Sequence, residues 1–288
     1  MIKEMKKVDI CCIGHLTKDL IITPGNEVKM TGGTAYYFGV ALSHLPKAVS
    51  FNIVTKMAEE DAAPVEAMRQ EGIDITCFPS RHTVCFENIY GADFNNRRQR
   101  VPAKADSFTI DELQDIDARI YHLGSLLQDD FSPELIEALS QKGRISIDVQ
   151  GFLREVRDEN VYPVDWKAKK AILAHTWYLK VNEEEMQTIT GLDDPHAAAQ
   201  QLREWGVREV VITLGDRGSL AYVDGNYEDI PAFPAKAVVD ATGCGDTYSA
   251  GYLYGRVQGW SPLESGRYAA RMCTEKLSHH GPFKGFTE

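Results

Sequence analysis

The sequence lacks several features that mark large classes of protein. No run approaches the roughly 18 to 20 consecutive apolar residues of a membrane-spanning helix, so we expect no membrane partner. The 31 Lys and Arg residues are outnumbered by 42 Asp and Glu residues. The resulting net charge of −11 argues against a nucleic-acid partner, which requires a basic patch. Internal repeats and low-complexity tracts are also missing, while 43% hydrophobic and 25% charged residues are ordinary for a globular protein.

Several sequence motifs are absent as well. None of the six cysteines forms a C-x-x-C pair, so we expect reduced thiols in a cytoplasmic protein. There is no G-x-x-x-x-G-K-[ST] motif of P-loop enzymes. No G-x-G-x-x-G follows the first apolar segment, which argues against a dinucleotide-dependent oxidoreductase. That segment is interrupted by Asp9 and has no small-residue cleavage site after it, so we interpret it as a buried strand rather than a signal peptide.

The segments that are present alternate between two kinds of pattern. From residue 118 onward, strand-like runs such as ARIYHLG and RISIDVQ alternate with helix-like runs such as PELIEALSQKG. This alternation predicts an α/β fold in which helices cover both faces of a parallel sheet, a three-layer sandwich. We predict one domain over residues 1–288, with two β-rich insertions, approximately 15–33 and 73–106, forming a small β lid. The candidate site is then the crevice at the carboxyl ends of the parallel strands.

The segment Asp240-Ala-Thr-Gly-Cys-Gly-Asp246 carries the clearest chemical signal. Gly243 and Gly245 permit a tight turn, and Asp246 stands where a helix begins. The unpaired amides and the dipole at a helix start favour an anion such as phosphate. A carboxylate beside an anion site is useful if it takes the proton of an alcohol that attacks the phosphate. A bare G-x-G-D is also compatible with a plain turn in which Asp246 caps a helix.

Further motifs occur in order along the chain. Residues 32–42 are a Gly-Gly pair followed by small and apolar residues, and Asp19 follows an early strand that ends at Gly14. An N-x-x-E motif begins at Asn182, and a T-x-G-x-x-G stretch begins at Thr213. Together with residues 240–246, this ordered set resembles the ribokinase-like sugar kinases, also called the phosphofructokinase-B type. The matches cover nearly the whole chain.

The resemblance implies ATP-dependent transfer of a γ-phosphoryl group to a hydroxyl of a sugar or polyol. Asp246 would be the general base, and the backbone amides of Gly243, Cys244 and Gly245 would stabilise the transferring group. The residues implied for the nucleotide phosphates and Mg²⁺ are Asn182, Glu185, Thr213, Gly215 and Gly218, with Glu185 acting on Mg²⁺ through water. The residues implied for the substrate are Asp19, Gly32 and Gly33. Asp240 matches a residue that in many members helps to bind a monovalent cation such as K⁺.

Some positions depart from the family pattern. Cys244 replaces a common Ala, and Ala241 replaces a Thr or Ser. Tyr37 stands where many sugar kinases use Asn on sugar hydroxyls, so it either contacts substrate or packs in the core, and specificity for ribose or fructose is not carried over. The stretch 148–154, ending in Arg154, resembles one in members that act on inositol and nucleosides. Arg154 would face an acidic substrate or the phosphates, or form a surface salt bridge.

The acceptor therefore stays open between a sugar, an inositol and a nucleoside, and a nucleotide- or sugar-binding regulator without catalysis is the alternative from another class. In the predicted lid, Arg97, Arg98 and Arg100 form a basic cluster that either closes over phosphate or is a solvated strand face. Glu87 and Asn88 are candidates for substrate contact on a lid strand. Exposed lid edges favour a homodimer formed through the lid.

Overall fold

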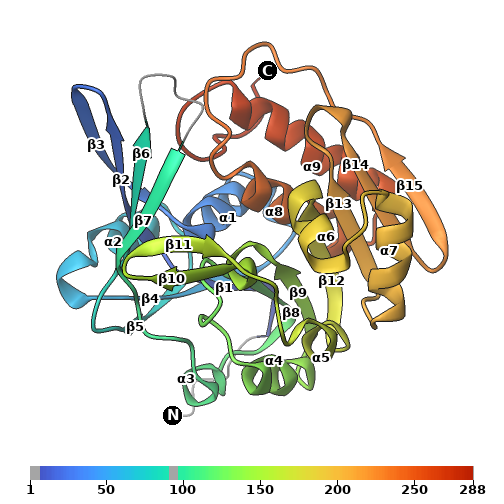
Figure 1. Cartoon of the computed structure of the whole chain (residues 1–288), viewed down its shortest axis with the longest axis horizontal. Helices are drawn as coiled ribbons and strands as arrows, with labels where there is room; N and C mark the ends of the chain where they lie inside the picture. The colour runs from blue at the N-terminus through green and yellow to red at the C-terminus, as the bar shows by residue number, and fades with distance from the viewer. Residues whose placement is uncertain (1–6, 91–96, 288) are drawn as a thin grey trace.

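The computed structural model describes residues 7–90 and 97–287. Within these residues the chain forms a nine-stranded main sheet and a six-stranded second sheet (Figure 1). The main sheet has the order β15-β14-β13-β12-β9-β8-β1-β4-β5. Its strands are β1 (Val8–Gly14), β4 (Phe51–Met57), β5 (Ile75–Pro79), β8 (Ala118–Gly124), β9 (Arg144–Asp148), β12 (Thr176–Asn182), β13 (Glu209–Thr213), β14 (Ser219–Val223) and β15 (Asn226–Ile230). The first seven of these pair in parallel, and β14 and β15 extend the sheet in antiparallel fashion.

Helices cover both faces of the main sheet, as Figure 1 shows. On one face lie α1 (Thr34–Ser43), α2 (Ala63–Gln70), α8 (Cys244–Val257) and α9 (Pro262–Leu277). On the other lie α4 (Pro133–Ser140), α5 (Lys169–Leu173), α6 (Glu183–Thr190) and α7 (Pro195–Glu204). The remaining helical segments are α3 (Ile110–Leu113) and the short turns η1 (Glu59–Asp61), η2 (Gln150–Leu153) and η3 (Gly215–Arg217).

Strand periodicity explains this three-layer arrangement. Along β1, Ile10 and Cys12 belong to the core beneath α1 and α8, while Cys11 and Ile13 belong to the core beneath α4 and α6. Successive side chains of a strand point to opposite faces, so a continuous apolar run must be covered on both sides. The predicted α/β sandwich is confirmed.

The second sheet corresponds in part to the two expected β insertions, and we refer to it as the lid sheet. Its order is β10-β11-β7-β6-β2-β3. The strands are β2 (Thr17–Thr23), β3 (Asn26–Gly32), β6 (Val84–Tyr90), β7 (Arg97–Ala103), β10 (Arg154–Arg157) and β11 (Asn160–Pro163). The structure places β5, inside the 73–106 insertion, in the main sheet beside β4, and it adds a third hairpin, β10–β11, to the lid. A short β-branched run fits either sheet, so the sequence pattern did not separate these cases.

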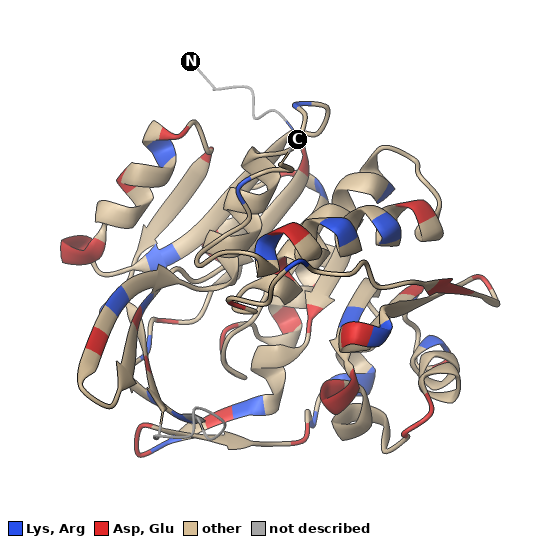
Figure 2. Cartoon of the chain, turned by 90° about the horizontal axis from the view of Figure 1, so that it is seen from above, with Lys and Arg blue, Asp and Glu red and all other residues tan. Residues whose placement is uncertain are grey.

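Charged residues are distributed over the body and the lid. In the view of Figure 2, Lys and Arg positions lie among Asp and Glu positions on the same helices and on the lid strands. None of the helices in residues 7–90 and 97–287 is both long and apolar enough to cross a bilayer.

Candidate active site

The carboxyl ends of the central strands meet in register at one edge of the main sheet. Gly14 of β1 is opposite Gly124 of β8, and Gly124 is opposite Asp148 of β9. Asp148 is in turn opposite Lys180 of β12. The first turns of α1 and α8 reach this edge, since a Cβ on Gly124 would lie 2.1 Å from Thr34 of α1 and a Cβ on Gly245 of α8 would lie 3.9 Å from Oδ2 of Asp148. Residues from four strands and two helices therefore converge here.

A buried ion pair stands at the centre of this edge. The ammonium of Lys180 lies 2.9 Å from Oδ2 of Asp148, and both side chains are largely buried. Burial opposes ionisation of each partner, but the attraction between the two charges raises the pKa of Lys180 and lowers that of Asp148. The sequence motifs did not single out Lys180. Its signal is a lysine in the middle of the apolar strand TWYLKVN, two residues before Asn182.

The glycine turn leads into α8 as expected. Gly243 is the N-cap of the helix with φ of 75°, a conformation that favours glycine. A Cβ on Gly243 would lie 2.2 Å from the ring of Tyr37, and a Cβ on Gly245 would lie 2.8 Å from Nζ of Lys180. The turn is therefore packed between an aromatic ring on one side and a buried cation on the other.

The first amides of α8 differ in their availability. The N–H of Cys244 donates to the carbonyl of Ala241 at 3.1 Å. The amides at the start of a helix otherwise have no partner within that helix, and they lie at the positive end of its dipole. The Cys273 thiol donates to the carbonyl of Cys244 at 3.2 Å, and this neighbouring thiol is the main cause of the lowered pKa of the Cys244 thiol.

Asp246 lies in the first turn of α8 with its carboxyl group among other charges. The nearby hydroxyl of Thr34, at the start of α1, lowers the pKa of this carboxyl group. Burial disfavours the charged carboxylate and Asp148 repels it, which together raise the pKa of Asp246 to about 7. The positive charge of Lys180 opposes this rise. A carboxyl group with such a pKa is matched to proton transfer near neutral pH.

The expected substrate residues lie together on the lid side of the same edge. Asp19 of β2 accepts a hydrogen bond from the Thr17 hydroxyl at 2.7 Å. A Cβ on Gly32 would lie 2.2 Å from Oδ2 of Asp19, and a Cβ on Gly33 would lie 2.2 Å from the carbonyl of His15. Gly33 also has φ of 93°. Neither position has room for a side chain, because the Asp19 carboxylate lies against Gly32 and the His15 carbonyl lies against Gly33. The Asp19 carboxylate therefore lies next to the start of α1.

Tyr37 joins the substrate side to the glycine turn. Its side chain is buried, yet within the described part of the chain its hydroxyl has no hydrogen-bond partner. Burial raises the pKa of Tyr37, and the carboxylates of Asp19, Asp240 and Asp246 raise it further. The residue thus packs in the core, and its hydroxyl lies in the field of all three carboxylates.

Asn182 and Glu185 form a reciprocal cap at the start of α6. Oδ1 of Asn182 accepts the N–H of Glu185 at 2.8 Å, and Oε2 of Glu185 accepts the N–H of Asn182 at 2.8 Å. Burial and the nearby Asp148 charge raise the pKa of Glu185, while Lys180 and Arg154 oppose this rise. Arg154 therefore lies within electrostatic reach of Glu185.

The donor set at this edge suits Mg²⁺ held largely by water. The Asp148 charge raises the pKa of both Glu185 and Asp246, and Lys180 offsets only one of the three charges. A divalent cation would neutralise the remainder. In the part of the chain that the structure describes, no cluster of three or more His, Cys, Asp and Glu side chains is arranged to bind a metal alone.

The expected nucleotide residues lie one strand further along. Thr213 ends β13 opposite Asn182, and its hydroxyl donates to the carbonyl of Val181 at 3.4 Å. Gly215 begins η3 with φ of 62°, and Gly218 ends it with φ of 96°. The T-x-G-x-x-G stretch is therefore a tight turn directly beside the Asn182–Glu185 cap.

Asp240 precedes the turn and pairs with an unexpected partner. The ammonium of Lys276, on α9, lies 2.7 Å from the Asp240 carbonyl and 3.1 Å from its Oδ2. Lys276 is fully buried. Asp240, the residue expected to help bind a monovalent cation, thus binds this ammonium through both its carbonyl and its carboxylate.

The lid arginines bind lid residues. Arg100 pairs with Glu87 at 2.8 Å, and Arg98 donates to Asn160 at 2.9 Å. Asn88 accepts a hydrogen bond from Gln99 at 2.9 Å. Arg97 lies at the start of β7, but its side chain is outside the described residues. In this structure Arg98 and Arg100 stabilise pairing between lid strands.

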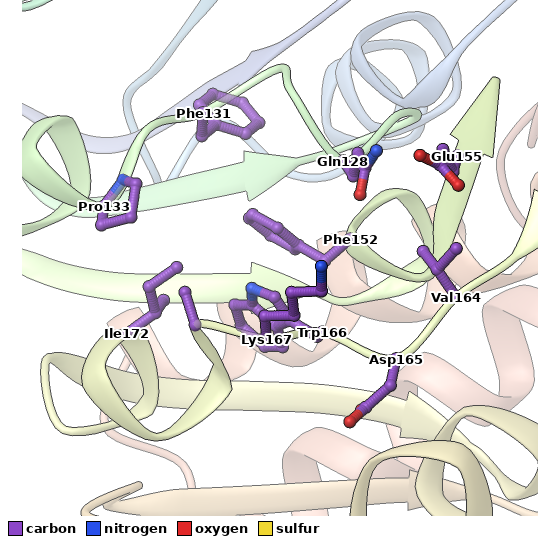
Figure 3. A pocket seen from close by; sticks show the side chains of 11 residues that line it. Gln128, Phe131, Pro133, Phe152, Glu155, Val164, Asp165, Trp166, Lys167 and Ile172 are labelled. Atoms are coloured by element: carbon purple, nitrogen blue, oxygen red, sulfur yellow. The ribbon is translucent and has the colours of Figure 1, made fainter. Parts of the chain in front are cut away.

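A cavity of about 300 Å³ lies beside this edge of the sheet (Figure 3). Phe152 and Trp166 stack in its wall with ring centroids 4.4 Å apart. Among the described residues, its lining comes from the segments after β8 and β9 and from the segment before α5, and it includes neither Asp246 nor Asn182. The cavity is therefore separate from the cluster around the glycine turn.

Comparison with known proteins places this geometry in a family. The model of the pfkB family of carbohydrate kinases matches residues 8–285. A cytidine kinase of Thermococcus kodakarensis is 31% identical over 266 residues, covering 89% of this chain and 91% of that protein.

Two solved structures agree with this assignment. A pyrophosphate-dependent kinase in the ribokinase family, in complex with sulfate, has a TM-score of 0.87 at 29% identity and covers 96% of this chain and 97% of its own. A pyrophosphate-dependent kinase in the same family, in complex with a pyrophosphate analogue and myo-inositol, has a TM-score of 0.85 at 28% identity, with the same coverage. The chain therefore belongs to the pfkB family of carbohydrate kinases and is a phosphotransferase that acts on hydroxyl groups.

Proposed function

We propose that this kinase transfers the γ-phosphoryl group of ATP to a hydroxyl of a small polyhydroxylated acceptor, with Asp246 as the general base. The observation that carries the proposal is the position of Asp246, in the first turn of α8, with a pKa raised to about 7. In the reaction, the acceptor hydroxyl gives its proton to Asp246, its oxygen forms a bond to the γ-phosphorus, and the bond to the ADP oxygen breaks.

The chain's own residues supply charge and position for this transfer. The amides of Gly243 and Gly245 at the start of α8 would hold the transferring group, and Cys244 would contribute its amide only if the bond to Ala241 opened. The ammonium of Lys180 lies against Gly245 and offsets negative charge there. Mg²⁺, bound through water to Glu185, would neutralise charge on the donor phosphates. Thr213, Gly215 and Gly218 would lie along the nucleotide.

For the acceptor, we place a nucleoside first and myo-inositol second, with free sugars third. A cytidine kinase resembles this chain over nearly its whole length, which supports the nucleoside. Two glycines, Gly32 and Gly33, leave room for the Asp19 carboxylate near the start of α1. There it would accept hydrogen bonds from acceptor hydroxyls. The buried ring of Tyr37, in place of an amide side chain, weighs against the sugar.

A second candidate is a kinase that uses pyrophosphate and phosphorylates myo-inositol. Its support is the high structural similarity, at 28–29% identity, to pyrophosphate-dependent kinases of the family. The reaction would use the same base and turn, because pyrophosphate offers the same terminal phosphoryl group as ATP.

One assay separates these candidates. The purified chain with Mg²⁺ would be tested with ATP or pyrophosphate as the donor and with cytidine, other nucleosides, myo-inositol, ribose and fructose as acceptors, while phosphorylated product is measured. The proposal predicts ATP with a nucleoside as the best pair. Pyrophosphate with myo-inositol as the best pair would establish the second candidate instead. Donor and acceptor binding without product formation would contradict both.

We also propose that any homodimer forms through the lid. β3 is an edge strand of the lid sheet, and Val28 on it is exposed. An unpaired edge can pair with a second copy. Sedimentation would show a dimer for the natural chain and a monomer for Val28→Lys. A dimer that persists in that variant would contradict the lid interface.

A further inference from the structure

Lys276 is enclosed by protein behind the glycine turn. It lies one residue before the end of α9 and has no exposed side-chain surface. Its ammonium contacts two oxygens of a single residue, the carbonyl of Asp240 at 2.7 Å and its carboxylate at 3.1 Å. Burying an ammonium is costly unless it is paired and hydrogen-bonded, so this position calls for a reason.

Asp240 and the backbone beside it are also fixed by several hydrogen bonds. Oδ1 of Asp240 accepts the N–H of Thr242 at 2.9 Å, and the N–H of Val239 donates to the carbonyl of Leu277 at 2.7 Å. Oδ2 also accepts the N–H of Gly281 at 3.3 Å. The segment before the turn is thereby tied to the end of α9 on both sides of the ammonium. The charge of Lys276 is fixed relative to the start of α8.

The positive charge of Lys276 also affects a residue of the turn, Cys244. The Cys273 thiol donates to the carbonyl of Cys244 at 3.2 Å. The pKa of the Cys244 thiol is lowered first by this neighbouring thiol and then by the positive charge of Lys276. Burial and the carboxylates of Asp240 and Asp246 act in the opposite direction. Cys244 is the first residue of α8, so a phosphoryl group at this turn would feel the same charge.

We propose that the ammonium of Lys276 is a tethered cation that orders the 240–246 turn and supplies positive charge behind it, so that the kinase needs no added monovalent cation. A carbonyl and a carboxylate oxygen form a donor pair that suits a hard cation, and here the chain provides the cation itself. Lys276 is a positioning residue because it acts through the turn. The proposal rests on the proposed role of that turn in holding the transferring phosphoryl group.

The first test needs no substitution. Turnover of the natural enzyme with its best donor and acceptor would be measured in buffers in which tetramethylammonium replaces every K⁺ and Na⁺. Unchanged turnover is expected, since the ammonium already fills the position. A loss of activity that K⁺ restores would overturn the proposal.

The second test removes the charge. Lys276→Ala should lower turnover about tenfold or more in tetramethylammonium buffer, the scale of a lost charge-assisted hydrogen bond. K⁺ or ethylammonium should restore part of it by occupying the vacated space. Lys142→Met is the matched control, because Lys142 donates to the carbonyls of Leu113, Gln114 and Ile116 and is not part of the turn. It should show no cation response. Full turnover of Lys276→Ala without any small cation would contradict the proposal.

A third test does not depend on activity. The rate at which iodoacetamide labels Cys244 would be followed against pH, with the label located by mass spectrometry. Lys276→Met should raise the thiol pKa and shift the labelling profile to higher pH, whereas Lys142→Met should not. Superimposed profiles for Lys276→Met and the natural chain would refute the field argument even if no acceptor is known. A shifted profile in a chain that turns over no acceptor would instead locate the failure in the proposed function.

Discussion

The ammonium of Lys180 lies 2.9 Å from the carboxylate of Asp148 and directly beside Gly245 in the turn that begins α8. This pair connects the centre of the parallel sheet to the segment that carries Asp246. Because Lys180 also lowers the pKa of Asp246 while Asp148 raises it, the pair sets the charge state of the proposed base.

Breaking this pair should destabilise the fold and shift the activity profile. Lys180→Met leaves the Asp148 carboxylate buried without its partner, so we expect a loss of about 3–5 kcal/mol in the free energy of unfolding. Loss of the positive charge should also raise the pKa of Asp246 and move the rise of kcat/KM to higher pH. Chemical denaturation and pH–rate profiles would measure both effects.

The matched control for this substitution is Lys7→Met. Lys7 pairs with Asp117 at 3.2 Å, and both side chains are exposed, where an ion pair contributes only about 0–1 kcal/mol. The double variant Lys180→Met/Asp148→Asn should be more stable than Lys180→Met alone. Equal stabilities of the double and single variants would contradict the view that an unpaired buried charge causes the loss.

The backbone of the turn gives a second prediction. Gly243→Ala places a Cβ against the ring of Tyr37 in a residue whose φ is 75°, so we expect both strain and a displaced turn. Gly191→Ala is the control, since Gly191 has φ of 73° but open space around the missing Cβ. Both variants should lose about 1 kcal/mol of stability from the backbone, but only Gly243→Ala should also lose most of its turnover. Equal activities of the two variants would mean that the close contact with Tyr37 is unimportant.

Alkylation of Cys244 should inactivate the kinase. Its lowered pKa makes the thiol reactive, and an added group would crowd the start of α8. MgATP should protect against labelling, and Cys244→Ala should stay active and resist the reagent. Turnover that survives stoichiometric labelling at Cys244 would show that the turn does not hold the transferring group.

Sequence patterns predicted the layers of this fold well because the pattern in each strand is local. Cys11 and Cys12 face opposite cores, as strand alternation requires. The lid was harder to define. The run ITCF at the start of the 73–106 insertion belongs to the main sheet, and the β10–β11 hairpin is short and polar. Which sheet a short strand joins depends on partners that are distant in sequence.

The sequence predicted the glycine turns of the candidate site but not the buried lysines that neutralise its carboxylates. The glycines can be recognised in the sequence because neighbouring atoms lie too close to their Cα atoms for any side chain, as at Gly33 and Gly243. Lys180 and Lys276 carry no such pattern, because a lysine is ordinary in any sequence and only tertiary packing buries it. The N-x-x-E spacing fits the reciprocal cap that the structure shows, since Asn182 and Glu185 lie within one helical turn.

The raised pKa of Asp246 also predicts how stability depends on pH. A carboxyl group whose pKa is about 7 in the folded chain and 3.8 when unfolded adds stability below the lower value, and this contribution is lost as the pH rises through the higher one. Asp246→Asn carries no charge at any pH. Its melting temperature should therefore exceed that of the natural chain above about pH 7 and should approach it near about pH 4. A difference in melting temperature that does not change with pH would contradict the raised pKa.

The most direct test of Asp246 as the base is single-turnover product formation by Asp246→Asn with its donor and acceptor at saturation. We predict a fall in the rate of about 10² or more, with donor binding unchanged, because the acceptor proton then has no base to receive it. Thr213→Val, outside the proton path, should keep a rate much closer to that of the natural enzyme. An Asp246→Asn variant that forms product at the natural rate would contradict the assignment.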